Sequence, residues 1–250
     1  MNPGARQIAL SNSDAALRGD VFSAFNNPAG LSGLRDRELG VFYSPSPFGL
    51  KELSNAAAAY TEPLPLGTLS LGASTFGFSL YRKNNFLLAY ALEILDFSLG
   101  LSLNLHNLTI KNYGSANSLT LNPGILIPIL RELSWGLSVQ NILNASIGKE
   151  SGQIPRVVFT GFSYQPHRTV ILNAAIEKSS GSPVSFRTGI EYAIIKYFSL
   201  RIGLSTEPDR FSAGAGINYS FLKFDYAVFT HQDLGLTHQI GTVLSFNAND

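Results

Sequence analysis

The feature that most constrains the fold of this chain is a regular alternation of apolar residues with small or polar ones. Between positions 97 and 106, every odd residue is Phe or Leu, and the even positions hold Ser, Gly, Asn and His. The same period of two runs through 133–140, 198–205 and 211–220. Successive side chains of a β-strand point to opposite faces, so each segment has one apolar face and one small, polar face. The alternation therefore predicts an all-β chain.

Composition indicates which way the apolar faces point. A soluble barrel would turn them inward and cover its outside with charged residues. Here only 14% of the residues are charged, against roughly 25% in an average soluble protein. The pattern also provides more strands than the ~8 that enclose a filled core. We therefore expect the apolar faces to meet lipid, as they do in transmembrane β-barrels.

The connections between the alternating segments differ in length. Those at 63–65, 130–131 and 195–196 are tight, whereas the one at 144–155 is long. Outer-membrane barrels have short periplasmic turns and longer loops outside. We predict a transmembrane antiparallel β-barrel of about 14 strands over residues 38–250, with 12 strands as the alternative count. An even number of strands places both chain ends in the periplasm.

Residues 1–37 do not alternate, and they contain a motif that stops helices. In Asn27-Pro28-Ala29-Gly30, the proline lacks an amide donor and the glycine permits positive φ. Such a segment cannot lie in lipid, where unpaired backbone groups are costly. We therefore predict that residues 1–37 form a short plug (hatch) within the barrel lumen.

Several classes of function find no support in the composition. The chain has no cysteine, which excludes disulfides, thiolate catalysis and cysteine-based zinc sites. Its net charge of +1 gives no basic field for nucleic acid. No serine has a partnered base, and no two histidines have metal-ligand spacing. We predict no enzyme activity, no metal and no cofactor; the histidines are His106, His167, His231 and His238.

The sequence also predicts a location. No stretch approaches the ~18 apolar residues of a membrane helix, and the N-terminus has no apolar signal region. We expect a mature form of a bacterial outer-membrane protein, its signal peptide already removed, with outer-membrane lipid as its main partner.

Short motifs stand near both ends of the chain. Those near the N-terminus are Gly4-Ala5-Arg6, Ala15-Ala16 and Phe25-Asn26-Asn27-Pro28-Ala29-Gly30-Leu31. Those near the C-terminus are Phe224-Asp225-Tyr226-Ala227 and Leu234-Gly235-Leu236-Thr237-His238. The first set resembles the hatch, and the second the closing hairpin, of the FadL-like family of outer-membrane proteins, and most closely of its PorV/PorQ branch, which is associated with type IX secretion.

This resemblance implies a plugged barrel of fourteen strands and leaves three functions open. The first is a component or partner of a type IX secretion-like complex, which would bind other outer-membrane or secreted proteins. The second is a FadL-like diffusion channel for small hydrophobic molecules. The third is a structural barrel whose lipid-facing surface docks another membrane protein. The short outer loops weaken the first two.

Four charged residues are expected on the polar, lumen-facing side of the barrel: Arg187, Glu191, Arg201 and Asp225. Glu191 and Arg201 flank one tight turn and would lie opposite each other in the ladder. The charges are interpreted either as a constriction that selects permeants or as ion pairs that fix the structure, and the second is favoured. Asp225 is predicted to receive Arg6 or Arg18 from the plug.

The third strand changes phase after Thr75, since Phe76 and Phe78 take positions that the alternation assigns to small residues. A phase change predicts a β-bulge. In FadL-like barrels a kink in an early strand opens a lateral window, so the resemblance implies an exit route here.

Overall fold

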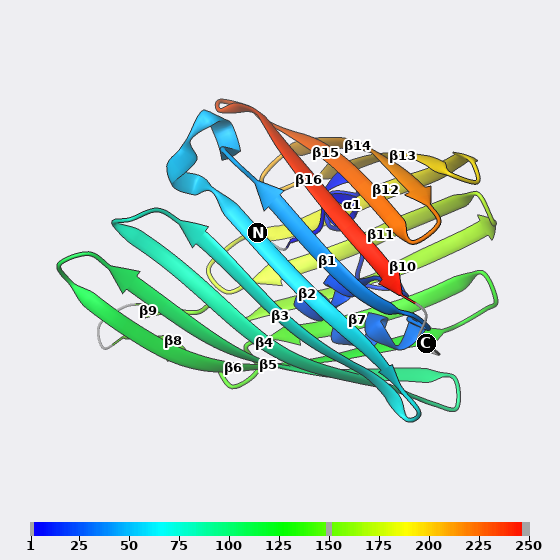
Figure 1. Cartoon of the computed structure of the whole chain (residues 1–250), viewed down its shortest axis with the longest axis horizontal. Coiled ribbons are helices and arrows are strands. Elements are labelled where there is room, and N and C mark those ends of the chain that lie inside the picture. The colour runs from blue at the N-terminus through cyan, green and yellow to red at the C-terminus, as the bar shows by residue number, and fades with distance from the viewer. Residues whose placement is uncertain (1–2, 149–151, 247–250) are drawn as a thin grey trace.

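The strands of the computed structural model close into one antiparallel barrel (Figure 1). The structure describes residues 3–148 and 152–246; the parts of the predicted plug, loop and barrel at 1–2, 149–151 and 247–250 lie outside the described residues. The barrel strands are β1 (Arg37–Ser44), β2 (Asn55–Leu64), β3 (Gly67–Gly77), β4 (Tyr81–Ile94), β5 (Phe97–Ile110), β6 (Gly114–Pro128), β7 (Leu133–Gln140), β10 (Val157–His167), β11 (Val170–Ser179), β12 (Val184–Ile195), β13 (Phe198–Ser205), β14 (Arg210–Tyr219), β15 (Leu222–His231) and β16 (Gly235–Phe246).

Fourteen strands confirm the predicted fold and remove the alternative of twelve. Each strand pairs with the next along the chain, and β1 closes the ring on β16 from Arg37↔Phe246 to Tyr43↔Ile240. The connection between β7 and β10 carries a separate two-stranded sheet of β8 (Ser146–Ile147) and β9 (Gly152–Gln153). Closure leaves no edge strand, which a barrel in lipid requires.

The apolar faces point out of the barrel, as predicted. On β5 the side chains of Leu101 and Leu105 are 46% and 45% exposed, whereas Ser98 and Ser102 on the other face are almost fully buried. The same arrangement, with leucine on the outside and serine on the inside, continues around the barrel. Such a surface is suited to lipid and not to water.

The N-terminal segment, defined as residues 3–36, lies inside the barrel (Figure 1). It contains α1 (Ala5–Ala9) and two 3₁₀ helices, η1 (Val21–Phe25) and η2 (Pro28–Gly33). Side-chain oxygens of Asp20 and Asn27 accept from the backbone amides of Phe22 and Ala29, which caps η1 and η2. No helix in the described part of the chain is long and apolar enough to cross a membrane.

Glycines on the inner face of the barrel make room for this segment. A Cβ added at Gly100 would lie 2.2 Å from the amide nitrogen of Ala29, and one at Gly136 would lie 2.1 Å from the carbonyl oxygen of Ala15. Both distances are well inside van der Waals contact, so the segment touches the bare backbone of the wall. Nine strands each place one glycine against it: Gly40, Gly72, Gly100, Gly124, Gly136, Gly189, Gly203, Gly214 and Gly241.

The bulge predicted after Thr75 is absent. β3 pairs with β2 and with β4 up to Asn55↔Phe76 and Gly77↔Arg82, without any shift of register. Phe76 occupies an ordinary lumen-facing position, where it lines a cavity, and Phe78 lies beyond the end of the strand. The apparent phase change arises because an apolar side chain faces inward here.

The glycine positions yield a test of how closely the N-terminal segment fits. A Cβ at Gly203 would lie 2.6 Å from both the carbonyl carbon of Leu10 and the amide nitrogen of Ser11. We expect Gly203→Val to weaken the docking of residues 3–36 by about 1–3 kcal/mol, the usual cost of overpacking. Faster hydrogen exchange of these residues measures the effect. Ala213→Val on the outward face of the neighbouring strand is the control, and equal exchange in the two variants would contradict the close fit.

Candidate functional site

A cavity of about 480 Å³ lies at the end of the barrel that carries the longer connections. It is formed by the lumen faces of β2–β5 together with η3 (Pro47–Gly49) and η4 (Lys51–Leu53), which connect β1 to β2. The residues that line it are Pro47, Phe48, Leu53, Asn55, Ser74, Phe76, Tyr81, Lys83, Asn84, Asn85 and His106. Most of the exposed lining is apolar, so the cavity suits an apolar molecule with a limited number of polar groups.

Phe48 holds the connection between β1 and β2 across this end of the lumen. Its backbone amide donates to Thr237 Oγ1 at 3.0 Å, and its ring packs edge-on against Phe229 at 5.8 Å and His231 at 5.2 Å between centroids. Phe48 takes a left-handed conformation with φ 57°, which is unfavourable for a side chain of this size. These contacts with β15 and β16 compensate for the strain and keep the phenyl ring at the cavity.

The opposite side of the cavity is polar and already hydrogen-bonded. Asn85 Nδ2 donates to Asn104 Oδ1 at 3.2 Å, and His106 Nε2 lies 2.9 Å from Thr120 Oγ1. Lys83 is exposed on the lumen-facing side of β4. A ligand therefore meets aromatic rings on one wall and amides with one cation on the other.

The N-terminal segment lies directly below this cavity. A Cβ at Gly72 would lie 3.1 Å from Cζ of Phe25, while the next lumen-facing residues of β3, Ser74 and Phe76, line the cavity. The segment also contacts inner-face glycines on eight other strands, so it occupies the lumen below the cavity.

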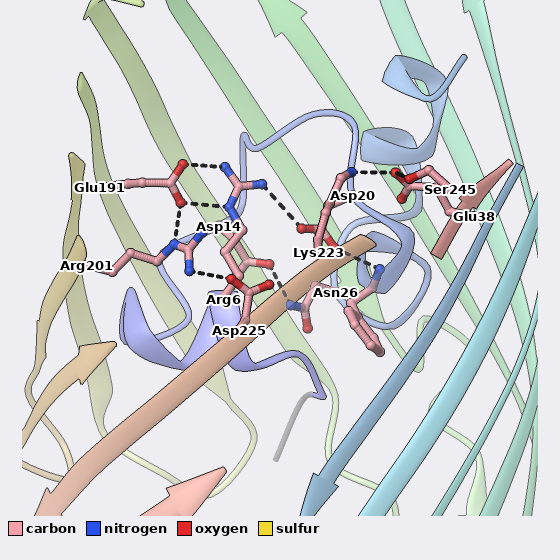
Figure 2. Close-up of polar contacts among 11 residues, drawn as sticks. Arg6, Asp14, Asp20, Asn26, Glu38, Glu191, Arg201, Lys223, Asp225 and Ser245 are labelled. Carbon is pink, nitrogen blue, oxygen red and sulfur yellow. Dashed lines mark hydrogen bonds and ion pairs between the residues drawn. The ribbon is translucent and has the colours of Figure 1, made fainter. Parts of the chain in front are cut away.

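Ion pairs join the N-terminal segment to the barrel wall (Figure 2). Arg6 donates from Nε and Nη2 to both carboxylate oxygens of Glu191, at 2.8 and 2.9 Å, and from Nη1 to Asp20 at 3.3 Å. Two-pronged Arg–carboxylate pairs are among the stronger polar contacts. This contact was not predicted, because the two residues are far apart in the sequence and only the docked segment brings them together.

Arg201 completes the network, as Figure 2 shows. It lies opposite Glu191 in the β12–β13 ladder and donates to it at 2.5 Å, and it also donates to Asp225 at 2.6 Å. The side chain reaches Asp225 on β15 across β14, where Gly214 and Gly216 leave the inner face bare.

The predicted partners of Asp225 were wrong. Arg6 forms ion pairs with Glu191 and Asp20. Arg18 donates to Ser98 at 2.6 Å and pairs with Glu93 at 3.1 Å. Arg201 takes Asp225 because the glycines of β14 put it within reach.

The remaining predicted residues lie apart from this network. Arg187 pairs with Glu177 at 2.6 Å, so the four lumen charges do not form one ring. In the Asn27-Pro28-Ala29-Gly30 motif, Asn27 Nδ2 donates to the carbonyl of Ala15 at 2.7 Å and to that of Ile125 on β6 at 3.2 Å. The motif thus fastens the segment to itself and to the wall. Among residues 3–148 and 152–246, no group of His, Cys, Asp or Glu is arranged to hold a metal.

A second, smaller cavity of about 150 Å³ lies beside the network, towards the end with the short turns. Arg6, Asp20, Glu38 and Lys223 are among its lining residues. Lys223 Nζ donates to Glu38 Oε1 at 2.6 Å, so charges of both signs surround it. Its small volume and charged lining distinguish it from the apolar cavity at the other end.

Asp14 in the N-terminal segment is buried and has no ion pair with any of the described residues. Burial raises its pKa to about 6, although the hydrogen bond from Asn26 Nδ2 to Asp14 Oδ2 at 2.6 Å opposes the rise (Figure 2). The docked segment therefore holds a carboxyl group that titrates close to neutral pH.

Loss of the Arg6–Glu191 contact should loosen the N-terminal segment. We expect Glu191→Gln to weaken its docking by about 3 kcal/mol, because breaking a buried pair leaves an uncompensated charge. Limited proteolysis should then cleave residues 3–36 faster. Glu177→Gln is the control, since it disrupts an ion pair between two barrel residues. Equal cleavage of both variants would show that the Arg6 contact does not hold the segment.

Docking of the segment should also depend on pH through Asp14. The folded pKa of Asp14, about 6, lies above the unfolded value of about 3.9. The contribution of Asp14 to the stability of docking is therefore complete below pH 4 and is lost as the pH rises through 6. The difference between the two pKa values limits this loss of docking free energy to about 3 kcal/mol. We expect urea to release residues 3–36 at lower concentration at pH 8 than at pH 5, and Asp14→Asn to reduce this difference. The exposed Asp36→Asn is the control, and an unchanged pH dependence in Asp14→Asn would contradict the assignment.

Comparison with known proteins supports the fold. No family model and no curated protein matches the chain. Solved structures do: the toluene transporter TodX of Pseudomonas putida has a TM-score of 0.69 at 11% identity, covering 99% of this chain and 98% of that chain.

A TodX deletion mutant described as a monoaromatic hydrocarbon channel has a TM-score of 0.74 at 12% identity over 98% of both chains. A FadL homologue of Pseudomonas aeruginosa has a TM-score of 0.66 at 11% identity over 97% of both chains. At such identities the likeness establishes the fold, which is that of FadL-type outer-membrane barrels; it gives no support to the PorV/PorQ branch in particular.

Proposed function

We propose that this protein is a non-enzymatic channel of the bacterial outer membrane that takes up small hydrophobic molecules. The observation that carries the proposal is the cavity beside Phe48 and Phe76, which is largely apolar and lies at the end with the longer connections. Its 480 Å³ falls within the roughly 300–1,000 Å³ of small-molecule sites. In the orientation typical of outer-membrane barrels, with the longer loops outside, the cavity faces the outside and the short turns face the periplasm.

Residues 1–37 act in this proposal as the plug of a barrel formed by residues 38–250. The segment blocks the lumen below the cavity, so uptake requires either that it moves or that the molecule leaves through the wall. The ion pairs of Arg6 and the glycine contacts favour a plug that stays docked while no ligand is bound.

Transport of small molecules is preferred to a role in type IX secretion. The solved structures that share the fold are described as a toluene transporter and a hydrocarbon channel, and the cavity has the size of a small molecule. No feature of the described residues favours cargo proteins or the docking of another membrane protein, the other two functions considered.

A substitution that fills the cavity tests the proposal. Ser74 lines it from β3, so Ser74→Trp should occupy much of its volume and reduce uptake of toluene and decanoate into proteoliposomes at least tenfold. The control is Ala73→Trp, which adds the same ring to the neighbouring residue on the lipid-facing side. Uptake that is equal in both variants, or absent in the parent protein, would refute the proposal.

A further inference from the structure

The outward-facing residues of β3–β6 change from apolar to polar at one height along the barrel axis. On all four strands the last apolar outward-facing residues are register partners: Ala73, Phe86, Leu105 and Leu119. Below this row, the outward-facing residues of β4, β5 and β6 stay mainly apolar over 86–94, 97–105 and 119–127. Each range has nine residues, about the length of a strand that crosses a bilayer. The strands continue past this row, so their ends extend beyond the hydrocarbon core.

The next outward-facing row consists of amides and a hydroxyl. Thr75 Oγ1 donates to Asn84 Oδ1 at 2.9 Å, Asn84 Nδ2 donates to Asn107 Oδ1 at 3.4 Å, and Asn107 Nδ2 donates to Asn117 Oδ1 at 2.8 Å. The same four residues are register partners on adjacent strands. We call this row the amide ladder. Each asparagine has two donors and two acceptor lone pairs, so hydrogen-bonding capacity remains on its outward side.

Two cations lie above the amide ladder. Arg82 is the next outward-facing residue of β4, and Lys111 directly follows β5, where its backbone amide donates to the carbonyl of Leu80 at 2.9 Å. Both side chains are exposed, and neither takes part in an ion pair among the described residues. None of the outward-facing residues of β3–β6 is acidic. The surface is therefore positively charged without an internal counter-charge.

The amide ladder lies at the height of the lipid headgroups. Two residues along a strand tilted by about 45° rise roughly 5 Å, whereas the headgroup layer extends about 5–7 Å beyond the core on each side. The amide ladder lies one such step above the apolar row, within this layer, and Arg82 lies two steps above it, so the cations border the layer on its outer side. On the opposite wall, large apolar residues such as Phe186, Leu204 and Leu236 face outward near the strand ends, with Lys178 and His238 as separate polar residues. The continuous row of hydrogen-bonded amides lies on β3–β6.

We propose that the amide ladder with Arg82 and Lys111 binds the phosphorylated sugar headgroup of an outer-leaflet glycolipid. Sugar hydroxyls both donate and accept, and they match the unused donors and acceptors of the asparagines. The phosphates supply the negative counter-charge that the two cations do not find among the described residues, at the outer border of the headgroup layer. The inference uses the orientation proposed above and does not depend on what the cavity carries.

Binding of purified lipid A tests this proposal with the full chain in detergent. The probes are lipid A with both phosphates, the same lipid after dephosphorylation, and phosphatidylglycerol, each titrated by native mass spectrometry. Each basic residue near an anionic lipid surface contributes about 1 kcal/mol, so Arg82→Ser with Lys111→Ser should weaken binding of phosphorylated lipid A roughly 30-fold. The matched control removes two other exposed cations, by Arg168→Ser with Lys178→Ser, and should bind as the parent does.

A second variant separates sugar recognition from charge. Asn84→Leu with Asn107→Leu should weaken lipid A at least tenfold and leave phosphatidylglycerol unchanged. Arg82, Asn84 and Asn107 lie on the outer face, and Lys111 and Arg168 are exposed in turns. The heat-dependent gel mobility of the barrel checks that each variant is folded. Equal affinity of the parent for phosphatidylglycerol and lipid A, or unchanged lipid A binding in the Arg82/Lys111 variant, would overturn the proposal.

Discussion

The structure depends on one constraint: within lipid, every backbone amide and carbonyl of the wall must find a partner in another strand. A ring of fourteen strands closed by β1 and β16 meets this requirement. Closure then obliges each strand to show lipid one face and the lumen the other, which is the alternation of leucine with serine and glycine on β5. A ring of this size also encloses more space than its own inward side chains can fill.

The N-terminal segment fills that space because the inner wall is made of small residues. Gly100 and Gly136 let backbone meet backbone, and polar contacts such as Arg6 with Glu191 set the position of the segment. Buried ion pairs add little net stability but penalise the loss of one partner strongly. The segment is thus held by contacts that favour one docked position, and the raised pKa of Asp14 predicts that its docking depends on pH.

Period-two alternation predicted about 14 strands, and the low charge content was needed as well to predict which faces point outward. The Glu191–Arg201 pairing could be predicted because it follows from register within one hairpin. The partner of Asp225 could not be predicted, since it depends on glycines of the intervening strand. The cavity was missed for the same kind of reason. Phe48 reaches it only because its connection folds across the lumen to Thr237, and Phe76 was interpreted as a bulge when it is an inward-facing wall residue.

The apolar cavity and the amide ladder are two faces of one wall. On β4, Lys83 and Asn85 lie on the cavity side of the wall, while Asn84, which also borders the cavity, has its side-chain amide in the ladder outside. This follows from strand geometry, because lengthening a hairpin past the bilayer adds residues to both faces at once. A wall that is long enough to form a cavity above the N-terminal segment must therefore present an outer surface to the headgroup layer. That surface has to be polar, and cations without acids are the composition that an anionic outer leaflet favours.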